Sequence, residues 1–316
     1  MADQKRPFLE TGLGVVLIAI LCNLLWGSAI PFINLGYRCF AVESADTPSQ
    51  ILFAGVRFMM AGALTVLICS VIRRRLALPK KGGFHRVAAL AMTQTVTQYF
   101  LFYVSLAHTE AVKSSIIQGL NSFVVILVAC YLFHTERMTR RKALGGLLGI
   151  GSVFAVQLNG HGVSADFSLM GEGAMLLSLV ANATSASLIK RFGREDDPMA
   201  LSGWQFMLGG CIMAAVGFRF DGRLVPESPL GVLVLLYLAA LSATAYSLWA
   251  LLLSVHPVSR IAAYMVLQPI FGVLLTMLLT RGATPLSPLR IALALALVSG
   301  SILLITTDRK QAEAPR

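Results

Sequence analysis

The sequence is short of charge. Only 13% of its 316 residues are charged while 56% are hydrophobic, and soluble domains carry roughly 25% charged residues. So few charges cannot cover so large an apolar core in water, which excludes an ordinary soluble domain and favours a lipid bilayer as the solvent. The net charge of +11 does not indicate a nucleic-acid partner, because the cations stand in short blocks between apolar runs.

Groups for catalysis are also missing from the apolar runs. The fifteen Asp and Glu residues fall in loops, tails or helix ends, the five histidines in loops or interfaces, and the five cysteines have no metal-ligand spacing. An intramembrane enzyme needs acids, histidines or a metal at membrane depth, so the sequence predicts no enzyme, no cofactor and no metal. A proton-coupled cation antiporter usually needs an acid in its pathway, so facilitated diffusion or exchange is the simpler expectation.

What the sequence does contain is a series of long apolar runs. About 20 apolar residues span a bilayer, and none of the runs has the short alternating strands of a membrane barrel. We therefore predict an all-α polytopic membrane protein with ten transmembrane helices. The predicted spans are 12–34, 50–72, 84–106, 112–133, 142–158, 171–189, 198–218, 230–253, 259–280 and 289–306.

The distribution of Lys and Arg predicts the orientation of these spans. Most of the basic residues fall on the side of the chain termini if the ten spans alternate in direction. Because cytoplasmic loops carry the excess of Lys and Arg, both termini are expected in the cytoplasm. At the starts of predicted spans, 47–50 reads as a capping box, and Asp-Pro or Ser-Pro pairs precede three later spans.

The chain also repeats itself. A shift of 147 positions places Tyr99 on Tyr246, and a shift of 148 places Phe58 on Phe206. We interpret this as a duplication into two five-helix repeats, 1–160 and 161–316. Five is odd, so the second repeat enters the membrane in the opposite sense. Inverted repeats are typical of secondary transporters, whose halves exchange conformations around a central site; a duplicated bundle without a transport role is the alternative.

Several segments resemble one family in order and spacing. They are NLLWGSAIPFINL at 23–35, VRFMMAG at 56–62, the segment 111–139 ending in Glu136-Arg137, and the matching segment 258–279. Together they resemble the EamA branch of the drug/metabolite transporter superfamily. The resemblance implies a ten-helix carrier of small metabolites, often an exporter, with a cavity lined by helices one, three, four, six, eight and nine. Two positions depart from the family pattern: Asn121-Ser122 replaces a usual proline, and Ala283 replaces a usual acid.

Polar and aromatic residues within the spans are the candidates for binding a substrate. In hydrocarbon, a side-chain dipole needs a partner and should face the bundle interior or a watery cavity. The alternative is that the amides tie helices together and the aromatic rings are buried core or interfacial residues. The candidate substrate-binding residues are Trp26, Gln94, Gln98, Tyr99, Gln118, Asn121, Asn182, Tyr246, Trp249, Tyr264 and Gln268.

Cations near these candidates are few. Arg57 is the one charge that lies inside a predicted span away from its ends. It is either functional or an arginine that snorkels or bonds backbone carbonyls near a helix end. Lys113 and Arg260 sit at helix starts and either attract an anionic group or mark the membrane interface. Phosphorylated cargo would need several Lys or Arg, so the sequence favours a small neutral or zwitterionic metabolite, for example an amino acid.

These observations predict a secondary transporter, with export as the direction, working by alternating access in the inner membrane. The alternative on the same fold is a non-transporting membrane receptor or assembly factor. Small-residue faces such as Gly145 and Gly149 in one predicted span allow close helix packing within a monomer or at a homodimer seam.

Overall fold

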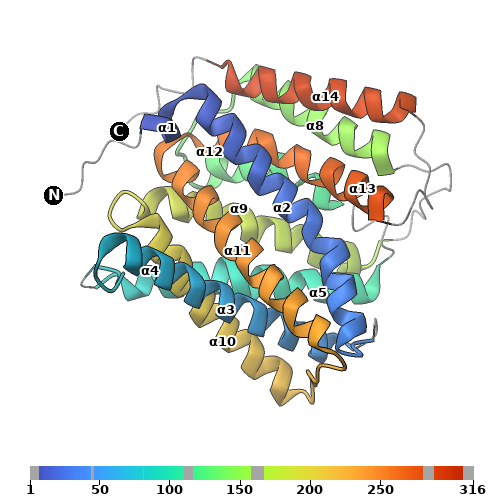
Figure 1. The fold of residues 1–316 in the computed structure, drawn as a ribbon. Helices are drawn as coiled ribbons and strands as arrows, with labels where there is room; N and C mark the ends of the chain where they lie inside the picture. The colour runs from blue at the N-terminus through green and yellow to red at the C-terminus, as the bar shows by residue number, and fades with distance from the viewer. Residues whose placement is uncertain are drawn as a thin grey trace.

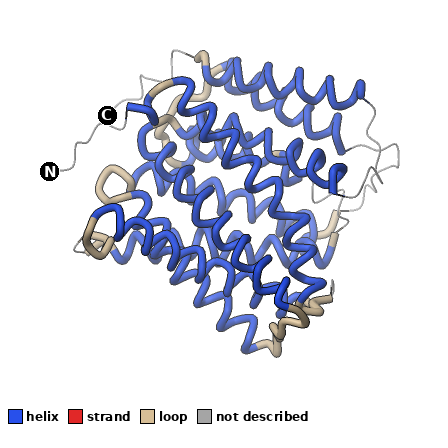
Figure 2. Tube along the Cα trace, viewed as in Figure 1, coloured by secondary structure: helices blue, strands red, loops and turns tan. Residues whose placement is uncertain are grey.

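The structure is a computed structural model, and it describes residues 7–43, 46–80, 82–109, 117–157, 167–279 and 288–308. Within these ranges every regular element is a helix, as Figure 2 shows. This confirms the all-α prediction for the described residues. Lys113, Ala283 and the predicted repeat boundary after residue 160 lie outside them.

The helices follow one another with short connections and pack into a single bundle (Figure 1). Three elements, η1, η2 and η3, are π-helical, and η4 is a 3-10 helix. In chain order the helices are α1 (Pro7–Glu10), α2 (Gly12–Cys39), α3 (Thr47–Arg73), α4 (Phe84–Leu90), η1 (Ala91–Thr97), α5 (Gln98–His108), α7 (Asn121–Leu127), η2 (Val128–Leu132), α8 (Arg140–Gln157), η3 (Leu169–Gly173), α9 (Ala174–Phe192), α10 (Pro198–Arg219), α11 (Pro229–Val255), α12 (Val258–Ala262), η4 (Ala263–Val266), α13 (Leu267–Leu279) and α14 (Pro288–Thr306).

Within the described ranges, five helices are long and apolar enough to cross a membrane: α2, α3, the continuous η3–α9 segment, α10 and α11. Shorter apolar helices cover Asn121–Leu132 and Ala292–Thr306. The predicted spans 84–106 and 259–280 are each divided, the first into α4, η1 and α5 and the second into α12, η4 and α13. Ten crossings therefore stay a prediction, while a multi-pass helical membrane protein is what the chain forms.

Several helices begin at the predicted proline junctions, although one cap differs from the prediction. Asp197 caps α10 by accepting a hydrogen bond from the Met199 amide, with proline in the first turn. At α3 the predicted capping box at 47–50 is wrong: Asp46 is the cap and accepts from the Ser49 amide at 3.1 Å. A carboxylate accepts this bond at a helix N-terminus at least as well as a threonine hydroxyl.

Glycines let α3 and α10 cross at close range. A Cβ built on Gly62 would lie 2.4 Å from the Met207 amide nitrogen, and one built on Gly210 would lie 2.4 Å from that of Met59. Residues later in α3 face residues earlier in α10, since Arg73 pairs with Asp197 at one end and Leu52 lies beside Gly217 at the other. The two helices are therefore antiparallel.

This crossing joins residues that the internal repeat relates. Gly62 and Met59 map by the shift of 148 onto Gly210 and Met207. Gly62 contacts Met207, and its equivalent Gly210 contacts Met59, so the same contact is made twice. Such reciprocal contacts are those of a two-fold related interface. Phe58 stacks on its own equivalent, Phe206, with ring centroids 5.2 Å apart and an interplanar angle of 8°. A two-fold relation between α3 and α10 follows.

The fifth predicted span of each repeat packs in the same manner. Helices α8 and α14 lie side by side at one edge of the bundle (Figure 1). Gly145 faces Ile305 and Ser301, and Gly151 approaches Leu297, so this pair is also antiparallel. The small residues of α8 thus pack against a helix of the same chain, as one of the two alternatives predicts.

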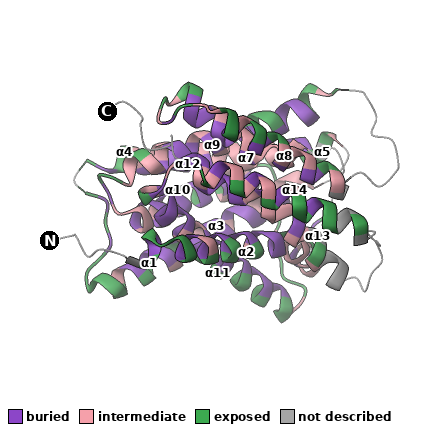
Figure 3. Ribbon diagram, turned by 90° about the horizontal axis from the view of Figure 1, so that it is seen from above, coloured by how far each residue is buried: buried purple, intermediate pink, exposed green. Residues whose placement is uncertain are grey.

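Figure 3 shows buried residues along the middle of the bundle and exposed ones on its outside. Many of the exposed side chains are large and hydrophobic. Outward-facing side chains on α3 include Leu67, Ile68, Val71 and Ile72, all exposed. Water would make so much exposed apolar surface unfavourable, whereas lipid solvates it. All five cysteines are free thiols.

Candidate functional site

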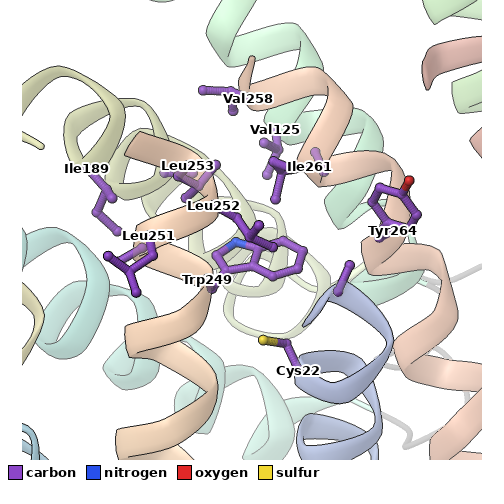
Figure 4. Close-up of a cluster of buried hydrophobic side chains, with 14 of the residues drawn as sticks. Cys22, Val125, Ile189, Trp249, Leu251, Leu252, Leu253, Val258, Ile261 and Tyr264 are labelled. Atoms are coloured by element: carbon purple, nitrogen blue, oxygen red, sulfur yellow. The ribbon is translucent and has the colours of Figure 1, made fainter. Parts of the chain in front are cut away.

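An aromatic cluster occupies the region between α2, α3, α5, α10 and α11. We define it as Trp26, Phe58, Tyr99, Phe206, Tyr246 and Trp249. The Trp26 ring lies 5.2 Å from that of Tyr246 and 4.9 Å from that of Trp249. Figure 4 shows Trp249 extending from α11 among buried side chains, with Cys22 of α2 nearby. Four predicted site residues from three helices thus come together.

The centre of this cluster follows the internal repeat. The Tyr99 and Tyr246 hydroxyl oxygens, which are repeat-equivalent, lie 2.5 Å apart. Phe58 packs on Tyr99 with a centroid distance of 4.6 Å, and its equivalent Phe206 packs on Tyr246 at 4.7 Å. Phe58 and Phe206 were not among the predicted site residues. Their signal was present in the sequence, because the repeat shift aligns them.

Three of the predicted amides form bonds between helices, and two of these three bond to each other. Asn182 Nδ2 of α9 donates to Asn121 Oδ1 of α7 at 2.9 Å. Gln205 Nε2 of α10 donates to Gln94 Oε1 at 2.9 Å, and Thr95 Oγ1 donates to Gln205 Oε1 at 2.8 Å. These are inter-helix ties, one of the two roles that the sequence allowed.

Three buried polar atoms near the aromatic cluster have no hydrogen-bond partner among the described residues. They are Asn23 Oδ1, Trp26 Nε1 and Gln98 Oε1. Asn23 is 0% exposed and Trp26 is 8% exposed, and they lie one turn apart on α2. Buried polar atoms are almost always paired, so an indole donor and two amide acceptors left unpaired can bind a solute that both donates and accepts.

Arg57 lies beside the aromatic cluster and is 4% exposed. Its Nε and Nη2 donate to Ser242 Oγ of α11 at 3.0 and 2.9 Å, and its guanidinium carbon lies 5.2 Å from the Phe58 ring centroid. The side chain is therefore buried within the bundle, and among the described residues its hydrogen-bond partner is a hydroxyl and not a backbone carbonyl. Within the described ranges no carboxylate pairs with it.

Comparison with known proteins gives the family. Residues 13–158 and 169–307 each match the EamA-like transporter family. The chain belongs to the EamA-like transporter family. One curated relative is an uncharacterized transporter of Synechocystis sp., 27% identical over 276 residues that cover 82% of this chain and 80% of the relative.

A second relative and a solved structure agree with this assignment. A WAT1-related chloroplast protein of Arabidopsis thaliana is 24% identical over 255 residues, covering 77% of this chain. The chain spans 60% of that relative's length. One protein of known crystal structure superposes with a TM-score of 0.75 at 18% identity, over 96% of this chain and 100% of that chain, and shares the fold. The family and the named transporter indicate a multi-pass membrane transporter.

The remaining predicted site residues of this EamA-family chain are Tyr264, Gln268 and Gln118. Tyr264 of η4 is buried and belongs to the same hydrophobic cluster as Trp249 (Figure 4). Gln268 of α13 and Gln118 are half-buried. Helix α13 packs closely on α2, where a Cβ on Gly27 would lie 2.8 Å from Phe271 Cβ. No hydrogen bond joins these three side chains to the aromatic cluster among the described residues.

A buried ion pair was missed by sequence reasoning. Glu136, expected in a turn at the end of a predicted span, is buried and accepts from Lys142 Nζ at 2.7 Å. It also accepts from the Ser259 amide at 3.1 Å and from the Ser259 hydroxyl. The pair fixes the start of α8 to the start of α12. In the sequence, Glu136 stands out only as part of the Glu-Arg turn that resembles the family. Nothing in the sequence predicts that Lys142 and Ser259 bond to it.

Proposed function

We propose that this EamA-family chain is a secondary transporter that exports small neutral or zwitterionic organic metabolites, such as amino acids, by alternating access. Membership of the family supports membrane transport. The aromatic cluster and the unpaired polar atoms around it support the class of solute.

The observation that carries the proposal is the antiparallel meeting of repeat-equivalent residues. Phe58 contacts Phe206, and the Tyr99 hydroxyl contacts that of Tyr246. Two halves related in this way can exchange conformations, which would open a site between them first to one side and then to the other. This supports ten spans in two inverted repeats, 1–160 and 161–316, as a monomer or a homodimer.

The chemistry of the site supports an uncharged or zwitterionic solute. Aromatic faces bind apolar groups, while the Trp26 indole and the amide oxygens of Asn23 and Gln98 bind polar ones. One buried arginine is too few for a phosphorylated compound, whose multiple charges require several cations. The protein itself does no chemistry on this solute and is proposed not to be an enzyme.

The basic residues support the orientation in the membrane. Arg73 and Arg74 lie at the C-terminal end of α3, and Lys190 and Arg191 lie in the last turn of α9. Cytoplasmic ends carry such residues. We therefore place both termini in the cytoplasm and the protein in the inner membrane.

Counterflow in proteoliposomes tests this function. Proteoliposomes that contain wild-type protein and are preloaded with an unlabelled amino-acid mixture should accumulate labelled amino acid and not a labelled sugar nucleotide. Replacing Trp26 by Ala should reduce the initial rate by at least about tenfold, since it removes a ring and a donor from the site. Trp204→Ala is the matched control, because Trp204 bonds the Ala77 carbonyl outside the aromatic cluster. Selective uptake of the sugar nucleotide would refute the proposed substrate class.

One observation favours the alternative, a membrane receptor or assembly factor that does not transport. The centre between the repeats is filled by large rings, including Trp26, Phe58 and Trp249. A permanently filled centre would give no counterflow with any solute and no effect of Trp26→Ala on solute exchange. Alternating access requires these rings to separate during transport.

A further inference from the structure

Arg57 is a buried positive charge, and no described carboxylate forms an ion pair with it. Among the described residues, two Lys or Arg residues are buried: Lys142, which is 0% exposed, and Arg57, which is 4% exposed. Lys142 has a carboxylate, Glu136, at 2.7 Å. Arg57 has the hydroxyl of Ser242. Lys142 serves as an internal comparison, because it is a similarly buried cation that has a carboxylate partner.

A hydroxyl is an incomplete partner for a guanidinium. Arginine stays charged at any physiological pH and carries five N–H donors, and buried charges in proteins are paired or coordinated. Ser242 Oγ accepts from Nε and Nη2, and Nη1 bonds to no described residue. The two Nη atoms form the fork that binds a carboxylate in bidentate geometry.

The surroundings of Arg57 extend this recognition. Phe58, whose ring lies under the guanidinium, contacts the rings of Tyr99 and Tyr246, and the hydroxyl oxygens of these two tyrosines are 2.5 Å apart. Tyr37 and Tyr103 lie with their hydroxyl oxygens 3.5 Å apart, one turn along α5 from the Tyr99 hydroxyl. Ser242 precedes Tyr246 by one turn of α11. Arginine and phenol donors thus gather at one end of the aromatic cluster.

We propose that Arg57 binds a single carboxylate of the transported solute, which takes the place of Ser242 Oγ when α3 and α11 separate. This rests on the proposed function and names its substrate class more closely: a monocarboxylate with an apolar or aromatic body. The carboxylate lies on Arg57 and the tyrosine hydroxyls, and the body lies among the rings of Trp26 and Trp249. One cation matches one carboxylate, whereas an amide or ester of the same compound leaves the guanidinium unbalanced.

Binding to the purified full-length protein tests the proposal directly. Trp26 and Trp249 are two of the three tryptophans of the chain, so their fluorescence reports on the aromatic cluster. The probes are L-phenylalanine and L-phenylalaninamide, which differ at the carboxylate. Wild type should bind the acid about 10 to 100 times more tightly than the amide, the range of one charge-assisted bond. Arg57→Gln should reduce this ratio to about 1, and Arg57→Lys should keep part of it.

Two controls separate charge recognition from folding. Arg73→Gln also removes one cation, but from the ion pair with Asp197 at the far end of α3, and should keep the wild-type ratio. Ser242→Ala removes the hydroxyl partner and keeps the charge, so a preference for the acid should persist. Equal acid-to-amide ratios in wild type and Arg57→Gln would overturn the proposal. So would a wild type that binds neither probe or binds both equally.

Transport of the same probes distinguishes this proposal from the proposed function. A protein that binds the acid through Arg57 yet gives no counterflow would refute transport and leave the carboxylate site standing. Counterflow of phenylalanine with an acid preference unchanged in Arg57→Gln would refute the carboxylate site and leave transport standing.

Discussion

Replacing Gly62 or Gly210 by alanine should destabilise the protein by equal amounts. The added Cβ of Gly62→Ala would lie 2.4 Å from the Met207 nitrogen, and that of Gly210→Ala would lie 2.4 Å from the Met59 nitrogen. Ordinary contact is 3.4–4 Å, and backbone atoms cannot rotate aside, so α3 and α10 must move apart by about 1 Å at the crossing. Such overpacking costs about 1–3 kcal/mol.

The control and the assay make this a test of symmetry as well as packing. Gly151→Ala meets its nearest neighbour, the Leu297 side chain, at 3.7 Å and should gain about 0.5–1 kcal/mol from helix propensity. The free energy of unfolding is measured in mixed detergent micelles by tryptophan fluorescence. Stability equal to that of Gly151→Ala would refute the close crossing. A difference of more than about 1 kcal/mol between Gly62→Ala and Gly210→Ala would refute its two-fold relation.

Three further predictions concern buried polar contacts. Lys142→Met should cost about 3–5 kcal/mol because it leaves the Glu136 carboxylate buried without its cation; Glu136→Leu added to it should restore most of the loss, and a double variant as unstable as the single would contradict the pairing. Tyr99→Phe and Tyr246→Phe should each cost about 1 kcal/mol, and together no more than either alone; additive losses would show that their hydroxyls are not bonded. Burial lowers the pKa of His256 below its ordinary value of 6.5. As the pH falls below that value, the unfolded chain therefore binds a proton that the folded protein does not, and the folded protein loses stability. The melting temperature of wild type should fall with pH more steeply than that of His256→Gln, and equal pH profiles would contradict this account.

The sequence was sufficient to predict the all-helical class and the residues that the repeat relates, but not the division of two predicted spans into shorter helices. Apolar runs of membrane length specify helices because lipid offers the backbone no other partner. The shift that aligns Tyr99 with Tyr246 also anticipates their contact, since equivalent residues near a two-fold axis meet each other. In this way local pattern and symmetry placed the centre of the aromatic cluster.

Other features depend on contacts between distant parts of the chain. Ser242 reaches Arg57 across 185 positions, and Ser259 reaches Glu136 across 123. Neither serine differs in sequence from the many that bond their own helix backbone. The burial of Glu136 and the partner of Arg57 follow from packing, which periodicity does not encode. The π-helical segment η1 inside a predicted continuous span is a further example, and nothing in its residues explains it.

The inverted arrangement is tested most directly by finding on which side of the membrane the C-terminal ends of α3 and α10 lie. Arg74 follows α3 and Asp221 lies just beyond the end of α10; both are exposed. Each is replaced by cysteine in a background whose five native cysteines are serine, and intact cells are labelled with a membrane-impermeant maleimide. The inverted arrangement predicts that Asp221→Cys is labelled from outside and Arg74→Cys only after the membrane is opened. Labelling of both from the same side would contradict it.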